Sequence, residues 1–348
     1  MSAARARRAT LLVLGIGLLV LGWSTPAGAH GVGGIEATNF ETTIRGVSPS
    51  IPGVEVRTVD IGEKIELRND GRREVVVIGY EREPYLRIGP DGVWENRSSP
   101  AVYLNRSLRP ERAAPARYDA DAPPDWRKIS SSPIARWHDH RAHWMDDADP
   151  PAVSRDPGRR HVVIEDWSIP LRVDGARHAI RGDVVWVPPP SPWPWIGLAA
   201  VLGVGLVVLS RTRCWAGAMT VALATLVVSE TVHLIGSWNA STDSVASRLA
   251  ASIYSIGGIA MAVLALIWLR RRDPWSATPA VLLAGMFMLV AGGLADLTSL
   301  TRSLVPTTLP PGLARLTVTL ALGLGAGLVV AAALRLRAPR PSRELTPG

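Results

Sequence analysis

The chain has 348 residues, enough for two domains, and combines 47% hydrophobic residues with a formal net charge of +8. Most of the basic excess lies in short arginine-rich segments beside long apolar runs, so it indicates membrane topology and argues against nucleic-acid binding. The sequence contains no nucleotide-binding loop, hydrolase triad or transport-ATPase signature, which argues against energy-driven pumping by this chain alone.

The N-terminus has the three-part layout of a secretory signal peptide. Arginines near the start precede an apolar run at 11–23, and small residues at Ala27 and Ala29 fit the cleavage rule. We therefore expect residues 1–29 to be removed, so that the mature chain begins with His30. The alternative is that a histidine follows the cleavage site by chance.

A histidine at the mature N-terminus can bind one metal ion through two nitrogens, those of the α-amino group and of the ring. The amino group has a reference pKa of about 7.7 to 8.0, so a metal ion displaces its proton easily. One imidazole from elsewhere in the chain completes a T-shaped set of three nitrogens, which suits Cu(II). His30 therefore predicts a copper site whose remaining ligand comes from another segment.

Residues 30–190 are predicted to form an extracytoplasmic β-sandwich. The single cysteine, Cys214, lies outside this segment, so an external metal site must use nitrogen, oxygen or methionine sulfur. Short runs with turn signals between them predict many strands, and no long amphipathic helix interrupts them. The predicted strands are 35–45, 54–59, 64–68, 74–80, 85–88, 101–104, 161–167, 169–173, 178–180 and 183–187.

The segment 136–145 holds three of the seven histidines of the chain. If it is a strand, His138 and His140 point to one face, where both can bind the same metal ion. His143 has the opposite parity and reaches that ion only if the chain bends after Arg141. The alternative is that these histidines only decorate a charged surface.

Residues 191–336 are predicted to form five transmembrane helices, each close to the roughly 20 residues that cross a bilayer. Arginines follow the first, third and fifth helices, so the positive-inside rule places these ends and the tail 337–348 in the cytoplasm. Residues 30–190 then lie outside a multi-pass cell-membrane protein, in agreement with the signal peptide. The predicted helices are 193–209, 214–235, 249–269, 277–297 and 313–334.

Three ionisable residues fall inside the predicted helices, where such residues are costly and often functional. Glu230 and His233 are three positions apart on one face of the second helix, and Asp296 lies near the end of the fourth. With this topology all three lie near the outer surface. They predict a second metal site or a relay. A structural hydrogen-bonded cluster and simple exposure to headgroups are the alternatives.

A cleavage site before histidine, a β-sandwich and a Trp-His-x-His motif about a hundred residues later resemble the copper-binding β subunit of particulate methane monooxygenase. The resemblance implies a cupredoxin-like fold and a histidine brace, with copper bound by His30, His138 and His140. It covers at most the segment 30–190, because five consecutive membrane helices are a different layout. The terminal histidine alone is also similar to periplasmic copper carriers and lytic polysaccharide monooxygenases.

These observations predict a membrane-anchored extracytoplasmic protein that captures, stores, delivers or hands over copper. Its expected partners are the copper ion, the lipid bilayer, and other membrane proteins or copper carriers. One alternative is a copper-dependent monooxygenase or oxidase, although the sequence displays no reductant route. The other is a metal-free assembly or interaction module.

Overall fold

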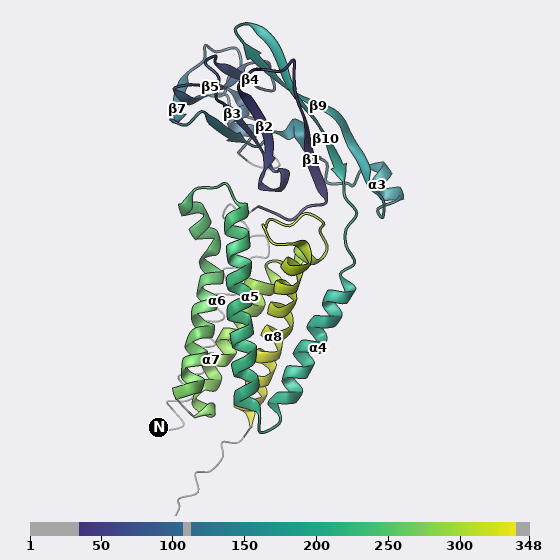
Figure 1. Cartoon of the computed structure of the whole chain (residues 1–348), viewed down its shortest axis with the longest axis vertical. Coiled ribbons are helices and arrows are strands. Elements are labelled where there is room, and N and C mark those ends of the chain that lie inside the picture. The colour runs from purple at the N-terminus through teal and green to yellow at the C-terminus, as the bar shows by residue number, and fades with distance from the viewer. Residues whose placement is uncertain (1–34, 107–112, 272, 339–348) are drawn as a thin grey trace, which may run out of the picture. The chain divides into compact units, whose positions relative to one another are not determined.

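The computed structural model describes residues 35–106, 113–271 and 273–338. They form two compact units, a β domain at Thr38–Pro189 and a helical domain that begins at Pro190 (Figure 1). His30, the predicted signal peptide and most of the predicted tail lie outside the described residues, so what the sequence implies for them stays a prediction.

The larger sheet of the β domain has seven strands in the order β1-β10-β9-β4-β5-β6-β7, and every neighbouring pair is antiparallel. Its first and last strands in the chain pair with each other, so the sheet joins both ends of the domain. The strands are β1 (Phe40–Ser48), β4 (Val75–Ile78), β5 (Pro84–Gly89), β6 (Gly92–Asn96), β7 (Trp126–Ser130), β9 (His161–Val173) and β10 (Ala176–Trp186).

The smaller sheet contains β2 (Val54–Val59), β3 (Lys64–Asn69) and β8 (Ile134–Trp137) in the order β2-β3-β8, again antiparallel. On one face of β3, Glu66 lies directly opposite Arg57 and Arg136 of its two neighbours and accepts a hydrogen bond from each. The alternate residues Ile65 and Leu67 turn into the core, and Glu66 on the other face is buried as well. This arrangement brings β8 and the histidines that follow it against the core.

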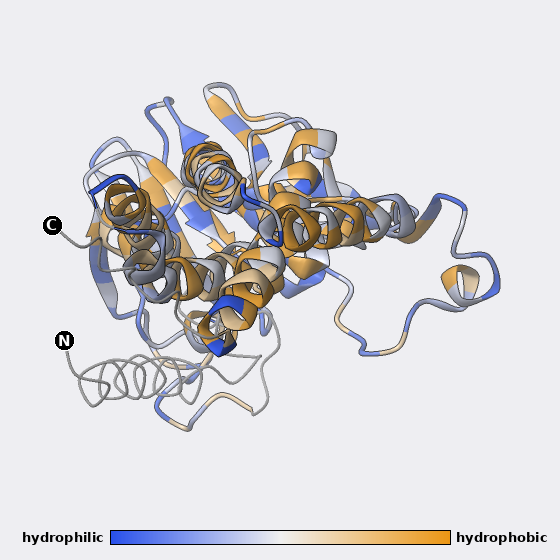
Figure 2. Ribbon diagram, turned by 90° about the horizontal axis from the view of Figure 1, so that it is seen from below, coloured by the Kyte–Doolittle hydropathy of each residue, from blue (hydrophilic) through white to orange (hydrophobic). Residues whose placement is uncertain are grey.

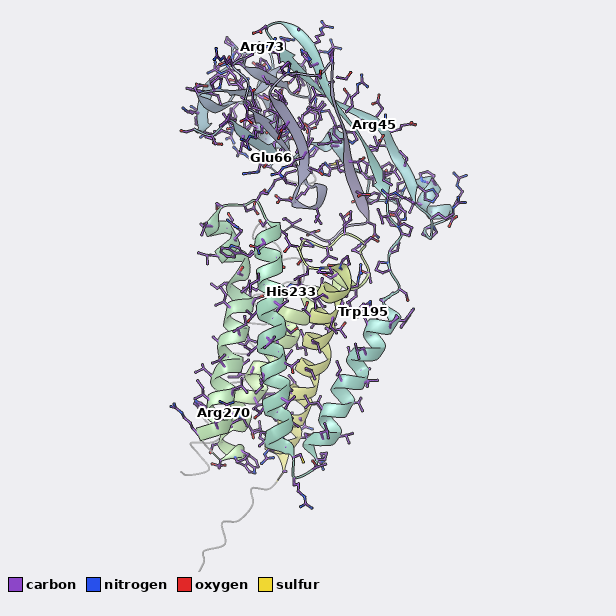
Figure 3. All side chains as sticks on the ribbon, in the orientation of Figure 1. Arg45, Glu66, Arg73, Trp195, His233 and Arg270 are labelled. Atoms are coloured by element: carbon purple, nitrogen blue, oxygen red, sulfur yellow. The ribbon has the colours of Figure 1, made fainter. Side chains whose placement is uncertain are left out.

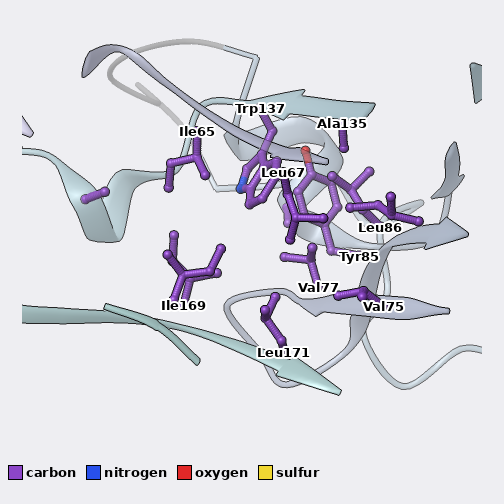
Figure 4. Close-up of a cluster of buried hydrophobic side chains, with 14 of the residues drawn as sticks. Ile65, Leu67, Val75, Val77, Tyr85, Leu86, Ala135, Trp137, Ile169 and Leu171 are labelled. Carbon is purple, nitrogen blue, oxygen red and sulfur yellow. The ribbon is translucent and has the colours of Figure 1, made fainter. Parts of the chain in front are cut away.

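One buried core lies between the two sheets (Figure 4). The smaller sheet contributes Ile65, Leu67 and Trp137, and the larger sheet contributes Val77 and Leu171, all nearly inaccessible to solvent. The predicted antiparallel β region is therefore confirmed. The cupredoxin-like topology within it stays a prediction.

Some predicted strands differ from the structure for local reasons. The predicted strand 101–104 is wrong: Ser99 caps a short helix, α2 (Pro100–Leu104), whose first residue is a proline. The four short strands predicted after residue 160 form one long hairpin of β9 and β10. Its two turn residues, Asp174 and Gly175, have φ values of 48° and 82°, which suit a tight hairpin turn.

The helical domain has five helices long and apolar enough to cross a membrane among its described residues, which confirms the predicted number. The fourth changes character along its length, because α7 passes into a π-helical segment, η3, before a short 3₁₀ turn, η4 (Leu297–Leu300). The helices are α4 (Trp193–Ser210), α5 (Trp215–Ala240), α6 (Val245–Arg271), α7 (Pro274–Phe287) with η3 (Met288–Leu294), and α8 (Pro311–Arg337).

Helix α4 packs against α8 through small residues. A Cβ atom built on Gly323 of α8 would lie 2.5 Å from the backbone oxygen of Ala199, so only glycine allows the two backbones to approach this closely. The opposite face of α4 carries Val201 and Val204, which are 69% and 64% exposed. Figure 2 shows long hydrophobic stretches on the helices, and apolar exposure of this kind suits contact with lipid.

Candidate functional site

The histidine segment leaves the strand just before its first histidine. Strand β8 ends at Trp137, His138 and Asp139 follow without regular structure, and a 3₁₀ turn, η2 (His140–Ala142), begins next. The Asp139 side chain accepts a hydrogen bond from the backbone amide of Arg141 and so starts the turn. The prediction of a continuous strand is therefore wrong, and the chain bends earlier than expected.

Asp139 is the centre of a buried network that fixes this bend. It is fully buried, accepts a hydrogen bond from Trp137 Nε1 at 3.0 Å, and holds the Arg141 guanidinium with two bonds of 2.8 Å. Arg141 also donates to the carbonyl of Ile78 and lies over the ring of Tyr80. Burial lowers the pKa of Arg141, but its bonds to Asp139 outweigh this effect and raise the pKa overall.

Tyr80 ties the second histidine to the same network. Its hydroxyl accepts a hydrogen bond from the backbone amide of His140 at 2.9 Å and donates one to Asn105. Burial and the charge of Asp139 raise the pKa of Tyr80, so the hydroxyl keeps the proton that it donates. The turn is thereby held at its first residue, His140, as well as at Arg141.

The bend brings all three histidine rings together. The ring centroids of His138 and His140 are 5.0 Å apart, and those of His138 and His143 are 4.2 Å apart. Strand parity does not explain this proximity, because His140 is the first residue of the 3₁₀ turn and His143 follows its last residue. The histidine rings are brought together by a short turn, whereas the sequence pattern predicted that a strand would do so.

His138 has the hydrogen bonding typical of a metal ligand. Its Nδ1 lies 2.8 Å from the carbonyl oxygen of Glu63, and because a carbonyl only accepts, Nδ1 carries the proton. In the neutral ring the other nitrogen, Nε2, therefore carries a lone pair. This nitrogen is buried without a hydrogen-bond partner among the described residues. Burial and the neighbouring His143 lower the pKa of His138 to about 3.

His143 is arranged differently. Its Nδ1 lies 2.7 Å from the carbonyl oxygen of Asp139, and its Nε2 lies 3.0 Å from that of Gly62. Both ring nitrogens therefore face carbonyl oxygens, and neither points to an open position. Burial lowers the pKa of His143, while the two carbonyls act in the opposite direction. In this arrangement His143 packs against His138 and presents no lone pair to a shared ion.

A pocket of about 300 Å³ opens beside His138. Its wall is mainly polar and charged, with Trp137 and Val102 as apolar parts. The lining residues are Glu63, Lys64, Tyr85, Glu95, Val102, Asn105, Arg106, Arg136, Trp137 and His138.

The predicted ligand set is only partly within the described residues. His30 lies outside them, and the described part of the chain contains no group of three or more His, Cys, Asp or Glu side chains arranged to hold a metal ion. His161 and His178 each contact a single backbone carbonyl, of Asp156 and Pro49, away from the histidine turn. His138 and His140 thus form at most half of a site.

The helical domain brings together the ionisable residues predicted there. Nε2 of His233, on α5, lies 3.3 Å from Oδ2 of Asp296, which follows η3 (Figure 3 labels His233). The other ring nitrogen lies 3.1 Å from the hydroxyl of Thr317 on α8. Glu230 is one turn before His233 and is only 3% exposed. Thr317 was not predicted, and its only signal is a hydroxyl in an apolar run.

Comparison with known protein families, curated proteins and solved structures finds no match. The resemblance to the methane monooxygenase β subunit therefore depends on the two histidine motifs alone. Glu63, Asp139 and Tyr80 complete the surroundings of the histidines and were missed. Glu63 acts through its backbone carbonyl, to which the sequence offers no signal, whereas Asp139 lies inside the histidine motif and could have been found.

Proposed function

We propose that this chain is a membrane-anchored, extracytoplasmic copper-binding protein that captures, stores, delivers or hands over copper. The proposed ligands are the α-amino and ring nitrogens of His30 together with His138 and His140. Cleavage before His30 creates the amine ligand. The five helices anchor the protein, with residues 30–190 outside, as the arginines after the first, third and fifth helices favour.

The observation that carries the proposal is the state of His138. A buried acceptor without a partner costs about 1 to 3 kcal/mol, and a metal ion bound at Nε2 of His138 would remove that cost. Histidines that bind metal ions usually donate their second nitrogen to a carbonyl or carboxylate, and His138 donates to Glu63 in this way. The low pKa of His138 keeps the ring neutral, which is the form that binds a metal ion.

The nature of the donors favours copper. The domain contains no cysteine, and its candidate ligands are nitrogens. Imidazole and amine nitrogens in a planar set suit Cu(II), which also has the highest affinity in the divalent series. His140 contributes the second imidazole, with its backbone fixed by Tyr80.

A titration of the full-length protein tests the proposal. The mature N-terminus is identified by mass spectrometry, and Cu(II) binding is followed by electron paramagnetic resonance. We expect one tightly bound Cu(II) with nitrogen ligands. His138→Gln should weaken binding by more than about 100-fold, beyond the loss typical of an outer partner. His178→Gln, a change of a half-buried histidine in the same domain, should stay within about twofold.

A second variant tests the amine ligand. One alanine inserted between Ala29 and His30, confirmed as the new terminus by mass spectrometry, separates the α-amino group from the histidine ring. Copper affinity should then fall as strongly as in His138→Gln. Unchanged affinity in either variant contradicts the proposal.

The pocket beside His138 favours a second candidate, a copper-dependent oxidase or monooxygenase. A pocket next to a proposed ligand gives a small substrate access to the site. Oxygen consumption by the copper-loaded protein with ascorbate as reductant, lost in His138→Gln, would support the enzyme. Tight binding without oxygen consumption would favour the carrier.

A further inference from the structure

The helical domain contains a second cluster of titratable groups that is independent of the copper proposal. Glu230 and His233 lie on one face of α5 and are 3% and 8% exposed. Asp296 contacts the His233 ring from the segment after η3. Helix α8 adds Thr317 on the other side of the ring. All of these groups belong to the helical unit.

The hydrogen bonds around His233 show that its pair with Asp296 holds a proton. The Thr317 hydroxyl donates to the carbonyl of Ala314 at 2.7 Å, so it accepts from Nδ1 of His233, which must carry a hydrogen. Nε2 then faces the Asp296 carboxyl at 3.3 Å. This contact is favourable only with a proton between them, whether it is bonded to the ring or to the carboxyl. The pair therefore has no net charge in either form.

Because His233 is paired with Asp296, it is not available to neutralise Glu230, which has no cation as a partner in the described part of the chain. Its Oε1 is buried and has no hydrogen-bond partner among the described residues. Its Oε2 lies beside Gly292 of the π-helical segment, where a Cβ atom would be 2.5 Å from it. The glycine makes room for a carboxyl group, and π-helical turns are frequent at functional sites.

No cation from the surrounding helices is aimed at Glu230 in the described structure. Helices α4 and α7 and the segment η3 carry no ionisable side chain. On α6, Arg248 donates to the carbonyl of Trp238 and lies over its ring. On α8, Arg315 donates to the carbonyls of Ser299 and Arg302. An ionised Glu230 would thus be a buried negative charge without a paired cation, which is costly inside a membrane domain.

We propose that Glu230, His233 and Asp296 form a proton-exchange site within the helix bundle, with Glu230 as the group that gains and loses the proton. In the loaded form Glu230 carries one proton, the His233–Asp296 pair holds another, and the site is neutral. On release the O–H bond of Glu230 breaks and the proton passes to water, which leaves one negative charge on the site. The pair keeps its proton throughout and holds the site in place.

Infrared difference spectroscopy of the full-length protein in lipid nanodiscs tests this site without copper. A protonated carboxyl group has a C=O stretching band that an ionised one lacks. We expect such a band at neutral pH, a shift of it in D₂O, and its disappearance as the pH is raised. Glu230→Gln should remove the band that titrates. Asp243→Asn, which changes a carboxyl in the loop after α5, should leave it in place.

Three outcomes would overturn the proposal. They are the absence of a protonated carboxyl band, a titrating band that remains in Glu230→Gln, and a spectrum in which no carboxyl band titrates or shifts in D₂O. The last would identify a sealed structural cluster. The pH titration and the D₂O shift use the unaltered chain, so they decide the question even if Glu230→Gln does not fold. Failure of copper binding would not affect any of these results.

Discussion

Asp139 and Arg141 form the ion pair on which the shape of the histidine turn depends. The carboxylate is fully buried and the guanidinium is mostly so, so neither charge is screened by water as an exposed pair would be. The pair also connects Trp137, Tyr80 and Ile78, which lie around the turn. The pair therefore stabilises the folded domain and also positions the residues of the histidine turn.

Replacing Asp139 tests this role. Asp139→Asn leaves the Arg141 charge buried without its partner, and the free energy of unfolding should fall by about 3 to 5 kcal/mol. Asp70→Asn, which breaks the exposed pair with Arg68, should cost about 1 kcal/mol or less. Denaturant unfolding of the purified protein measures both. Equal losses in the two variants would contradict a special role for the buried pair.

The protonation of His138 gives a prediction about pH. Burial lowers its pKa from 6.5 to about 3, so below pH 6.5 the unfolded chain takes up a proton that the folded chain does not. This difference favours the unfolded state, and the stabilisation present above pH 6.5 is lost progressively down to about pH 3. Nuclear magnetic resonance of ¹⁵N-histidine-labelled, copper-free protein should show His138 neutral, with its proton on Nδ1, at about pH 5. A midpoint near 6.5 would refute the assigned burial.

At the scale of elements, the sequence predicted best where periodicity is strong and nothing local competes. The strand predicted at 64–68, where apolar and polar residues alternate in the sequence, and the long apolar runs of the five helices both appear in the structure. The strand expected at 101–104 became α2 because Ser99 and Pro100 form a helix start that outweighs the β propensity of Val102 and Tyr103. The helix-starting residues thus determined the local structure more strongly than the strand propensity of the residues that follow them.

The sequence predicted which histidines belong to the candidate site, but it did not predict the hydrogen bonds and the bend that position them. The density of histidines in one short segment was visible, and His138 and His140 do lie close together. The carbonyl of Glu63 reaches His138 across 75 positions of sequence, and a backbone acceptor has no sequence signature. The bend at Asp139 depends on buried Arg141 contacts that only the folded core provides.

The contact between α4 and α8 gives a prediction at this scale. Gly323→Ala should place a methyl group against the backbone of Ala199 and cost about 1 to 3 kcal/mol by overpacking. Gly205→Ala, on the open side of α4, meets no atom within 4 Å and should be neutral or stabilising by up to about 1 kcal/mol. Thermal unfolding in detergent compares the two. A smaller loss for Gly323→Ala than for Gly205→Ala would exclude the close packing.

At the scale of the whole molecule, the proposed topology places Cys214 on the cytoplasmic side. It is the only cysteine of the chain, it is exposed, and it lies beside Arg211 and Arg213. A membrane-impermeant maleimide should therefore label the protein only after the cells are permeabilised. Cys214→Ser combined with Ser244→Cys, in the loop after α5, should be labelled in intact cells. The reverse pattern would invert the proposed orientation.

The lone pair of His138 also has a consequence for the lifetime of the protein in the cell. A chain without the proposed copper ion carries a buried, unsatisfied nitrogen, whereas copper at 100 times the Kd would add about 2.7 kcal/mol to the folded state. Proteases that act on transiently opened chains would then remove the unloaded form first. We expect a shorter half-life in copper-starved cells than in copper-replete cells, measured by pulse-chase labelling, and no such difference in His138→Gln. Protein abundance would then report copper supply without any dedicated regulator.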